Sequence, residues 1–245
     1  FEDHRDPDQI EHCVESLIKQ RVMGLALGYE DLNDHDTLRQ DPLLALLSDV
    51  ADPTGQDRRR AQDKGRALAG KSTLNRLELT PPDADAASRY KKIVADPEGK
   101  DDLLVDLFLE SHDTLPAEII LDVDATDDPL HGNQEGRFFH GYYRSYCYLP
   151  LYIFCEEHLL CARLRTANQD GAAGTVDELS RIVERIRSSW PKTRIIVRGD
   201  SGFCREDLMA WCEGHSVEYV LGVPKNSRLK AILAEEMAQA RSRYE

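Results

Sequence analysis

Apolar residues recur with a roughly helical spacing through the first part of the chain. The clearest example is a predicted helix from about Pro7 to Leu27, which Pro7 opens in the first turn and Gly28 ends. Its apolar positions are Ile10, Val14, Leu17, Val22 and Leu25. Further helical segments are predicted at 34–47, 72–80 and about 84–113, with a polar, aperiodic loop at 51–71. The pattern predicts a helical N-terminal region over residues 1–114.

The pattern changes at Leu115-Pro116, after which β-branched, aromatic and other apolar residues dominate. In the segment 117–126, AEIILDVDAT, apolar residues alternate with acidic ones, which is typical of a strand. Two more strand candidates follow at 137–146 and 148–166. The remaining predicted elements are a helix at 171–190, a strand at 193–200, a helix at 204–215, a strand at 217–224 and the start of a helix at 227–245.

The predicted order of these elements is β-β-β-α-β-α-β-α. A simple doubly wound sheet would alternate strands and helices from the beginning, so this order argues against that fold. It favours an α/β fold with a ribonuclease H-like mixed sheet, in which an antiparallel meander of three strands is followed by parallel strands. We therefore expect the core of the fold over residues 115–224.

Three aspartates in the predicted strands are candidates for chemistry. Period-two alternation puts Asp122 and Asp124 on the same face of one strand, and Asp200 ends a separate buried strand, RIIVRGD. Sites gather at the ends of parallel strands, so Asp124 and Asp200 are expected to converge if their strands are neighbours. Such oxygen ligands suit Mg²⁺ or Mn²⁺. A single aspartate at a strand end is more often a turn or helix cap, and spacing alone leaves both interpretations open.

Composition and charge narrow the classes of function. The net charge of −14 over 245 residues is unusual for a nucleic-acid binder, because phosphate contacts need a basic surface. One basic run, Arg58-Arg59-Arg60 with Lys64 and Arg66, is either a contact to a DNA backbone or a solvated loop. No apolar run approaches the roughly 20 residues that span a bilayer, and no leader precedes Phe1. The six cysteines include no Cys-x-x-Cys pair, so we expect a cytoplasmic protein with free thiols and no membrane partner.

Two segments resemble the first two catalytic motifs of insertion-sequence transposases in the DDE superfamily. In IILDVDAT, one residue separates Asp124 from Thr126, and IIVRGDSGF surrounds Asp200 with the Gly-Asp-Ser-Gly-Phe sequence of the second motif. The segments DHRDP, QRVMGLALGYEDLNDHDTLRQDP and KSTLNRLE are similar to one group, the insertion sequence thirteen-eighty transposases. The resemblance covers essentially the whole chain.

The resemblance implies a DNA transposase with an integrase-type, ribonuclease H-like catalytic core. Such an enzyme cuts and joins DNA strands at insertion-sequence ends by two-metal-ion phosphodiester hydrolysis and transesterification. Asp124 would bridge two Mg²⁺ or Mn²⁺ ions and Asp200 would hold one of them. The third carboxylate, a Glu, is expected outside this chain, which is then truncated at both ends and inactive alone, with residues 225–245 starting an inserted domain. Double-stranded DNA is the implied partner, bound by a homodimer and contacted in part by the N-terminal region.

The segment IILDVDATDD also fits the nucleophile motif of haloacid-dehalogenase-type, Mg²⁺-dependent phosphatases. In this alternative Asp122 forms an aspartyl-phosphate and Asp124 is the general acid and base. The acidic net charge favours the phosphatase, whereas the aromatic strands directly after the motif count against it. A non-catalytic binding module with the same fold is a third alternative.

Overall fold

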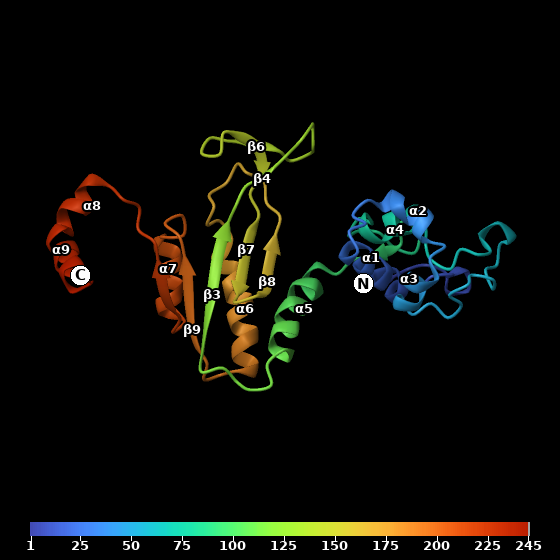
Figure 1. Cartoon of the computed structure of the whole chain (residues 1–245), viewed down its shortest axis with the longest axis horizontal. Coiled ribbons are helices and arrows are strands. Elements are labelled where there is room, and N and C mark those ends of the chain that lie inside the picture. The colour runs from blue at the N-terminus through green and yellow to red at the C-terminus, as the bar shows by residue number, and fades with distance from the viewer. Residues whose placement is uncertain (245) are drawn as a thin grey trace. The chain divides into compact units, whose positions relative to one another are not determined.

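The computed structural model describes residues 1–244, and the chain divides into two compact units, Phe1–Pro97 and Glu98–Glu245 (Figure 1). Each unit has buried apolar residues of its own. The division comes before residue 114, where the sequence pattern places the end of the helical region. The reason is that α5 (Pro97–Glu110) buries Val105 and Phe108 in the core of the second unit.

Short helices and one small sheet make up the first unit. In chain order its elements are β1 (Glu2–Asp3), η1 (Pro7–Gln9), α1 (Val14–Ala26), η2 (Leu32–Asp34), α2 (His35–Leu38), α3 (Pro42–Leu47), η3 (Ala61–Asp63), α4 (Lys71–Glu78) and β2 (Ile93–Val94). β1 and β2 pair antiparallel, so the beginning of the unit is joined to its end.

The helices of this unit are shorter than the hydrophobic pattern predicts. The helix expected from Pro7 is divided into η1 and α1, and the one expected at 34–47 is interrupted at Asp41, whose side chain caps α3. The helix predicted over 84–113 is wrong in its first part, because β2 is extended there and pairs with β1. Helical structure begins only at Pro97, since proline suits the first helical position and disfavours helix before it.

A buried glutamine connects α1 to the segment that precedes α4. Gln20 is only 1% exposed, and its amide oxygen accepts a hydrogen bond from the backbone N–H of Ala69 at 3.0 Å. Its Nε2 donates to the carbonyl oxygen of Ala69 at 2.8 Å and lies 3.0 Å from Nδ1 of His35. A buried amide is tolerated because its hydrogen-bonding groups are satisfied. The apolar residues of the unit form two small clusters: Leu17, Ala69, Leu74, Leu77 and Ile93, and Leu44, Ala45, Ala67 and Leu68.

A five-stranded mixed sheet forms the second unit. Its strands are β3 (Glu118–Ala125), β7 (Leu151–Cys155), β8 (His158–Arg163), β9 (Arg194–Gly199) and β10 (Glu218–Leu221), in the spatial order β10-β9-β3-β7-β8. β3, β7 and β8 pair antiparallel, whereas β9 is parallel to both β3 and β10. An antiparallel meander extended by parallel strands is the ribonuclease H-like arrangement, so the predicted fold class is confirmed.

The strands of the meander differ from those predicted. The segment 137–146 is not in the five-stranded sheet; it contributes to a separate three-stranded sheet of β4 (Asp128–Pro129), β5 (Phe138–His140) and β6 (Ser145–Tyr148), in the order β4-β6-β5. The candidate strand at 148–166 is instead the hairpin of β7 and β8. The hairpin turns at Glu156 and Glu157, which are exposed, and Glu156 adopts a positive φ of 53°. Two adjacent carboxylates cannot continue a buried strand, so the apolar run folds back on itself.

Helices α6 (Thr175–Ser189) and α7 (Glu206–Gly214) fall within the segments predicted for them and pack with the sheet. α6 presents an apolar face to the core, made by Leu179, Ile182, Val183 and Ile186. β3 contributes every second residue, namely Ile119, Leu121 and Val123, as the period-two pattern requires. Figure 1 shows α6 alongside this sheet.

The segment after β10 forms two helices, α8 (Ser227–Ile232) and α9 (Ala234–Tyr244). No residue described within them is buried. Among the helices of residues 1–244, none has the length and apolar character that crossing a bilayer requires.

Candidate active site

The two aspartates that the sequence singled out lie on neighbouring parallel strands. In the pairing of β3 with β9, Val123 is opposite Gly199. One residue further along, β3 reaches Asp124 and β9 ends before Asp200. The carboxyl ends of parallel strands share one edge of a sheet, so two residues separated widely in the sequence meet at that edge.

Both carboxylates at this edge are exposed and neither is bound to a cation. The carboxylate of Asp124 makes no hydrogen bond or ion pair with any other residue in the part of the chain that the structure describes. Oδ1 of Asp200 accepts a hydrogen bond of 2.7 Å from the backbone N–H of Gly202, and no ion pair within residues 1–244 involves this side chain. Asp200 therefore shapes its own turn, as the capping interpretation anticipated, while its other oxygen remains free.

Close packing around two glycines fixes the turn that carries Asp200. A Cβ atom added to Gly199 would lie 2.8 Å from Cγ2 of Val123, and one added to Gly222 would lie 2.8 Å from the backbone nitrogen of Ser201. The N–H of Gly222 also donates to the carbonyl oxygen of Gly199 at 3.0 Å. β9, β10 and the turn at 200–202 are thus held together by contacts that only glycine permits.

Replacing Gly199 by alanine is expected to lower the free energy of unfolding of the second unit by about 1–3 kcal/mol, the usual cost of overpacking. The added methyl group would overlap Val123, which is buried, and would approach Cβ of Phe203 at 3.1 Å. Urea unfolding followed by tryptophan fluorescence measures the change, because Trp190 and Trp211 both belong to this unit.

Gly214→Ala is the matched control for this variant. Gly214 is the exposed last residue of α7, and nothing lies within 4 Å of an added Cβ atom. Alanine is favoured over glycine in a helix, so this control should change stability by less than about 1 kcal/mol and in the favourable direction. Equal losses of unfolding free energy in Gly199→Ala and Gly214→Ala would contradict the packing argument.

Asp122, the third candidate, is held by an arginine of the neighbouring strand. Asp122 and Arg198 are directly opposite each other in the pairing of β3 with β9. Nη2 of Arg198 donates to Oδ2 of Asp122 at 2.8 Å, and Nε bonds the other carboxylate oxygen, which gives a bidentate ion pair. The Asp122 carboxylate also raises the pKa of Arg198. This pair explains why the strand carries two acids on one face: one of them is neutralised across the sheet.

Tyr143 faces the same acidic edge, although nothing in the sequence pattern singled it out. Its hydroxyl lies 3.5 Å from the carbonyl oxygen of Ala125, the last residue of β3. Burial and the negative charges of Asp127, Asp124 and Asp200 raise the pKa of Tyr143, so the phenol stays protonated near neutral pH. The residue belongs to the turn between β5 and β6, and only the folding of that small sheet brings it here.

A second ion pair engages another arginine, Arg205, which directly precedes α7. Nη2 of Arg205 donates to Oδ2 of Asp170 at 2.8 Å, which ties the segment before α6 to the residue that precedes α7. Arg205 lowers the pKa of Asp170, and the backbone N–H of Ala172 lowers it further. Arg198 and Arg205 are therefore both engaged by structural aspartates, and Asp124 and Asp200 keep their negative charge uncompensated.

The donor set at this edge fits a hard divalent cation. Mg²⁺ and Mn²⁺ prefer carboxylate oxygens, often take few protein ligands and complete their shell with water and phosphate oxygens. Asp124 and Asp200 provide such oxygens in an exposed position. Within residues 1–244, no three acidic, histidine or cysteine side chains come together as a set that could hold a metal ion. This edge of the sheet thus provides two exposed carboxylates for a metal ion, whose remaining ligands would be water or phosphate oxygens.

Comparison with known protein families matches residues 1–245 to the family described as Transposase DDE domain group 1. No curated protein is similar enough to the chain to count as a match. Among solved structures, the catalytic domain of Mos1 mariner transposase shares 11% identity, covering 58% of this chain and 68% of that one, with a TM-score of 0.31.

Two further solved structures are similar to the chain at the same low level. The Mos1 mariner paired end complex with Mn shares 11% identity and covers 96% of this chain and 75% of that one, with a TM-score of 0.31. The piggyBac transposase synaptic complex with hairpin DNA shares 13% identity and covers 78% of this chain and 53% of that one, with a TM-score of 0.35. Strand order and direction, rather than these similarities, identify the fold described above.

Proposed function

The chain belongs to the family Transposase DDE domain group 1, and from this premise we propose that it carries catalytic aspartates of a DNA transposase of the insertion sequence thirteen-eighty group. Its reaction is the cutting and joining of DNA strands at insertion-sequence ends by phosphodiester hydrolysis and transesterification. One observation carries the proposal: Asp124 and Asp200 lie at one edge of the sheet without a cationic partner among residues 1–244, whereas Asp122 and Asp170 are bound by arginines.

Asp124 and Asp200 would supply carboxylate oxygens to bound divalent metal, Mg²⁺ or Mn²⁺. Bound divalent ions supply a nucleophilic oxygen of lowered pKa and stabilise the leaving 3′-oxygen. The chain's own contribution is to keep the two carboxylates in place and available. The N–H of Gly202 orients Asp200, the packing of Gly199 against Val123 fixes its turn, and the pairing of Arg198 with Asp122 keeps that cation away from Asp124.

A third carboxylate is required to complete a site of this kind. We do not assign that role to Glu235 or Glu236, which belong to the exposed helix α9. We propose that a further glutamate supplies it and that this chain is inactive without that residue.

Double-stranded DNA is the proposed partner, bound by two copies of the protein so that two element ends are brought together, and the reaction belongs to the cytoplasm. The net charge of −14 requires that DNA contacts come from local basic surfaces, because phosphate contacts carry most of the affinity for DNA. The N-terminal unit has such a surface, which is described in the next subsection.

The acidic net charge suits the phosphatase alternative, but the contacts of Asp122 count against it. A nucleophilic Asp122 would have to be free to attack a phosphate, but Arg198 holds both of its carboxylate oxygens. β3 also pairs antiparallel with β7, which differs from a doubly wound sheet of parallel strands. Hydrolysis of an aryl phosphate that is lost in Asp122→Asn and retained in Asp124→Asn would overturn the transposase assignment.

Titration with Mn²⁺ tests the proposed centre in the chain as it is. We expect one saturable site at the edge of the sheet in the wild-type protein, detected by the loss of the free-ion signal in electron paramagnetic resonance. Asp124→Asn or Asp200→Asn should weaken Mn²⁺ binding by at least about tenfold, because each removes a charged oxygen ligand.

Asp122→Asn is the matched control, since it makes the same chemical change two residues away on the same strand and face. It should change the affinity for Mn²⁺ by less than about threefold, because Arg198 already neutralises this carboxylate. In crystals soaked with Mn²⁺, the anomalous signal should lie between Asp124 and Asp200. A signal elsewhere, or equal losses in all three variants, would refute the metal centre.

A further inference from the structure

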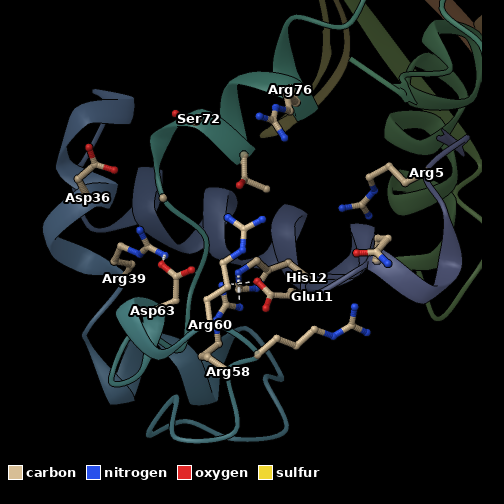
Figure 2. Close-up of a pocket in the computed structure, with 14 residues that line it drawn as sticks. Arg5, Glu11, His12, Asp36, Arg39, Arg58, Arg60, Asp63, Ser72 and Arg76 are labelled. Carbon is tan, nitrogen blue, oxygen red and sulfur yellow. Dashed lines mark hydrogen bonds and ion pairs between the residues drawn. The ribbon is translucent and has the colours of Figure 1, made fainter. Parts of the chain in front are cut away.

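Six arginines surround one cavity of about 390 Å³ in the N-terminal unit (Figure 2). They come from four separate parts of the chain, namely Arg5, Arg39, the run Arg58-Arg59-Arg60, and Arg76. Three carboxylates also line the cavity: Glu11, Asp36 and Asp63. Arginines therefore outnumber carboxylates around the cavity, even though Arg5 is also paired with Asp3, in a chain whose net charge is −14.

The one histidine of the cavity adds no charge near neutral pH. His12 is 9% exposed, and its Nε2 lies 2.7 Å from Nη1 of Arg58. Burial and the charge of Arg58 lower the pKa of His12 to about 3. The ring is therefore neutral and accepts a hydrogen bond from the guanidinium. The positive charge of the cavity is carried by arginine alone.

Two of the guanidinium groups are buried with an N–H group that has no partner. The side chain of Arg58 is 9% exposed; its Nη2 pairs with Glu11 at 2.9 Å, but its Nε donates to no residue within 1–244. Nε of Arg39 is likewise buried without a partner, although Nη2 lies 3.4 Å from Asp63. A buried donor left unpaired is costly, so its persistence indicates a ligand that accepts from it.

Two further arginines remain available at the cavity. The side chain of Arg60 is exposed and makes no hydrogen bond or ion pair with any other described residue. Arg76 pairs with no carboxylate among residues 1–244, and its guanidinium lies 5.5 Å from the ring centroid of Tyr90. Figure 2 shows Arg5, Arg60 and Arg76 around the same open space, with Arg39 and Asp63 together on one side of it. Arg60 and Arg76, which come from distant segments, thus line one cavity without a carboxylate partner among residues 1–244, whereas Arg5 is paired with Asp3.

The loop that carries three of these arginines is closed by its own backbone. The N–H of Gly65 donates to the carbonyl oxygen of Gly55 at 2.9 Å. Gly55 has a positive φ of 65°, and an added Cβ atom would lie 2.6 Å from the backbone nitrogen of Ala67. Only glycine fits this position. The arginine run is therefore presented by a constrained loop whose base is packed against buried chain, and its charges are pre-positioned.

We infer that this arginine cavity is a binding site for phosphate groups. Guanidinium groups match the geometry of phosphate oxygens and bind them with paired, charge-assisted hydrogen bonds. A volume of about 390 Å³ equals that of roughly a dozen water molecules, more than one phosphate needs, and so suits a ligand with linked phosphates or a nucleotide. The phosphate can belong to a nucleic-acid backbone or to a free phosphorylated molecule. The inference stands apart from the chemistry at Asp124 and Asp200.

Calorimetric titration of the whole chain with inorganic pyrophosphate tests the site. A metal-free buffer with chelator excludes binding through ions at the sheet edge. We expect saturable binding in the wild type and in Asp124→Asn, and a loss of at least about tenfold in Arg60→Gln, because one charge-assisted contact is removed. Arg60 is exposed and unpaired, so this variant should fold normally.

Arg66→Gln is the control, because it removes the same charge just beyond the run without lining the cavity. It should weaken pyrophosphate binding by less than about twofold. A short DNA duplex that competes with pyrophosphate in the wild type but not in Arg60→Gln identifies the source as nucleic-acid backbone. Binding without competition identifies a free phosphorylated ligand. The absence of saturable binding, or equal losses in Arg60→Gln and Arg66→Gln, overturns the site.

Discussion

Asp124→Asn is expected to lower DNA strand cleavage by at least about 1000-fold when the protein is assayed together with the third carboxylate. The substitution removes a charged oxygen ligand from the proposed metal centre, and several kcal/mol of transition-state stabilisation corresponds to that loss of rate. The carboxamide has nearly the same size as the carboxylate, and the Asp124 side chain makes no hydrogen bond or ion pair within residues 1–244 that the change could break. Nicking of supercoiled plasmid in Mg²⁺ measures the rate.

Binding of DNA separates a chemical role from a structural one in this experiment. Asp124→Asn should bind duplex DNA as the wild type does, within about twofold, since affinity depends on phosphate contacts elsewhere. Asp122→Asn should keep at least about one tenth of the cleavage rate, because it alters an ion pair with Arg198 and not the proposed centre. Comparable losses of cleavage in both variants would show that the strand as a whole, rather than Asp124, matters.

Much of the sheet and both proposed metal ligands could be predicted from sequence. Alternation along 118–125 identifies β3 and its buried face, because one face of a strand packs on the core and the other does not. A short apolar run that ends at Asp200 identifies a buried strand. Once both strands are placed in one sheet, parallel pairing brings their carboxyl ends together. These features depend on local patterns and one rule of topology.

Other features depend on contacts that no local pattern records. The partner of Asp122 is Arg198, and the two are opposite only because β9 pairs with β3 in one particular register. Tyr143 reaches the acidic edge through the small sheet of β4, β5 and β6, which the aromatic pattern suggested as part of the main sheet. In the N-terminal unit, short helices and capped turns replace the long helices expected, because Asp41 and proline interrupt the apolar periodicity.

The net charge of the chain likewise does not indicate where its charged side chains gather. Some of the acidic residues form ion pairs within the second unit. Arg181 and Arg185 of α6 pair with Asp102 of α5. Arg185 also pairs with Asp106. The basic run was visible in the sequence as either a contact or a solvated loop. The structure adds arginines from distant segments to it and leaves a buried N–H group on both Arg39 and Arg58 without a partner among residues 1–244. A strongly acidic chain therefore still contains a concentrated site of positive charge.

The same cavity makes the N-terminal unit sensitive to acid through His12. In the unfolded chain this histidine takes up a proton near its ordinary pKa of 6.5, whereas in the folded unit burial and Arg58 lower the pKa to about 3. The charges of Arg39 and Arg5 act in the same direction, and the charge of Asp63 opposes them. Below pH 6.5 the unfolded state therefore binds the additional proton, so the free energy of unfolding falls as the pH falls.

Between pH 7 and pH 4, His12 alone is expected to remove about 3 kcal/mol of stability from this unit, since one pKa unit corresponds to about 1.36 kcal/mol. Hydrogen exchange of amides in α1 and α4 of the whole chain measures the loss locally. His12→Gln keeps an acceptor for Arg58 but cannot take up a proton, so its stability should fall less with acid. Burial also lowers the pKa of His35, and that contribution is common to both proteins. The difference in pH-dependent stability between wild type and His12→Gln therefore isolates the contribution of His12. Parallel stability profiles against pH in the two proteins would show that Arg58 does not hold a neutral imidazole ring.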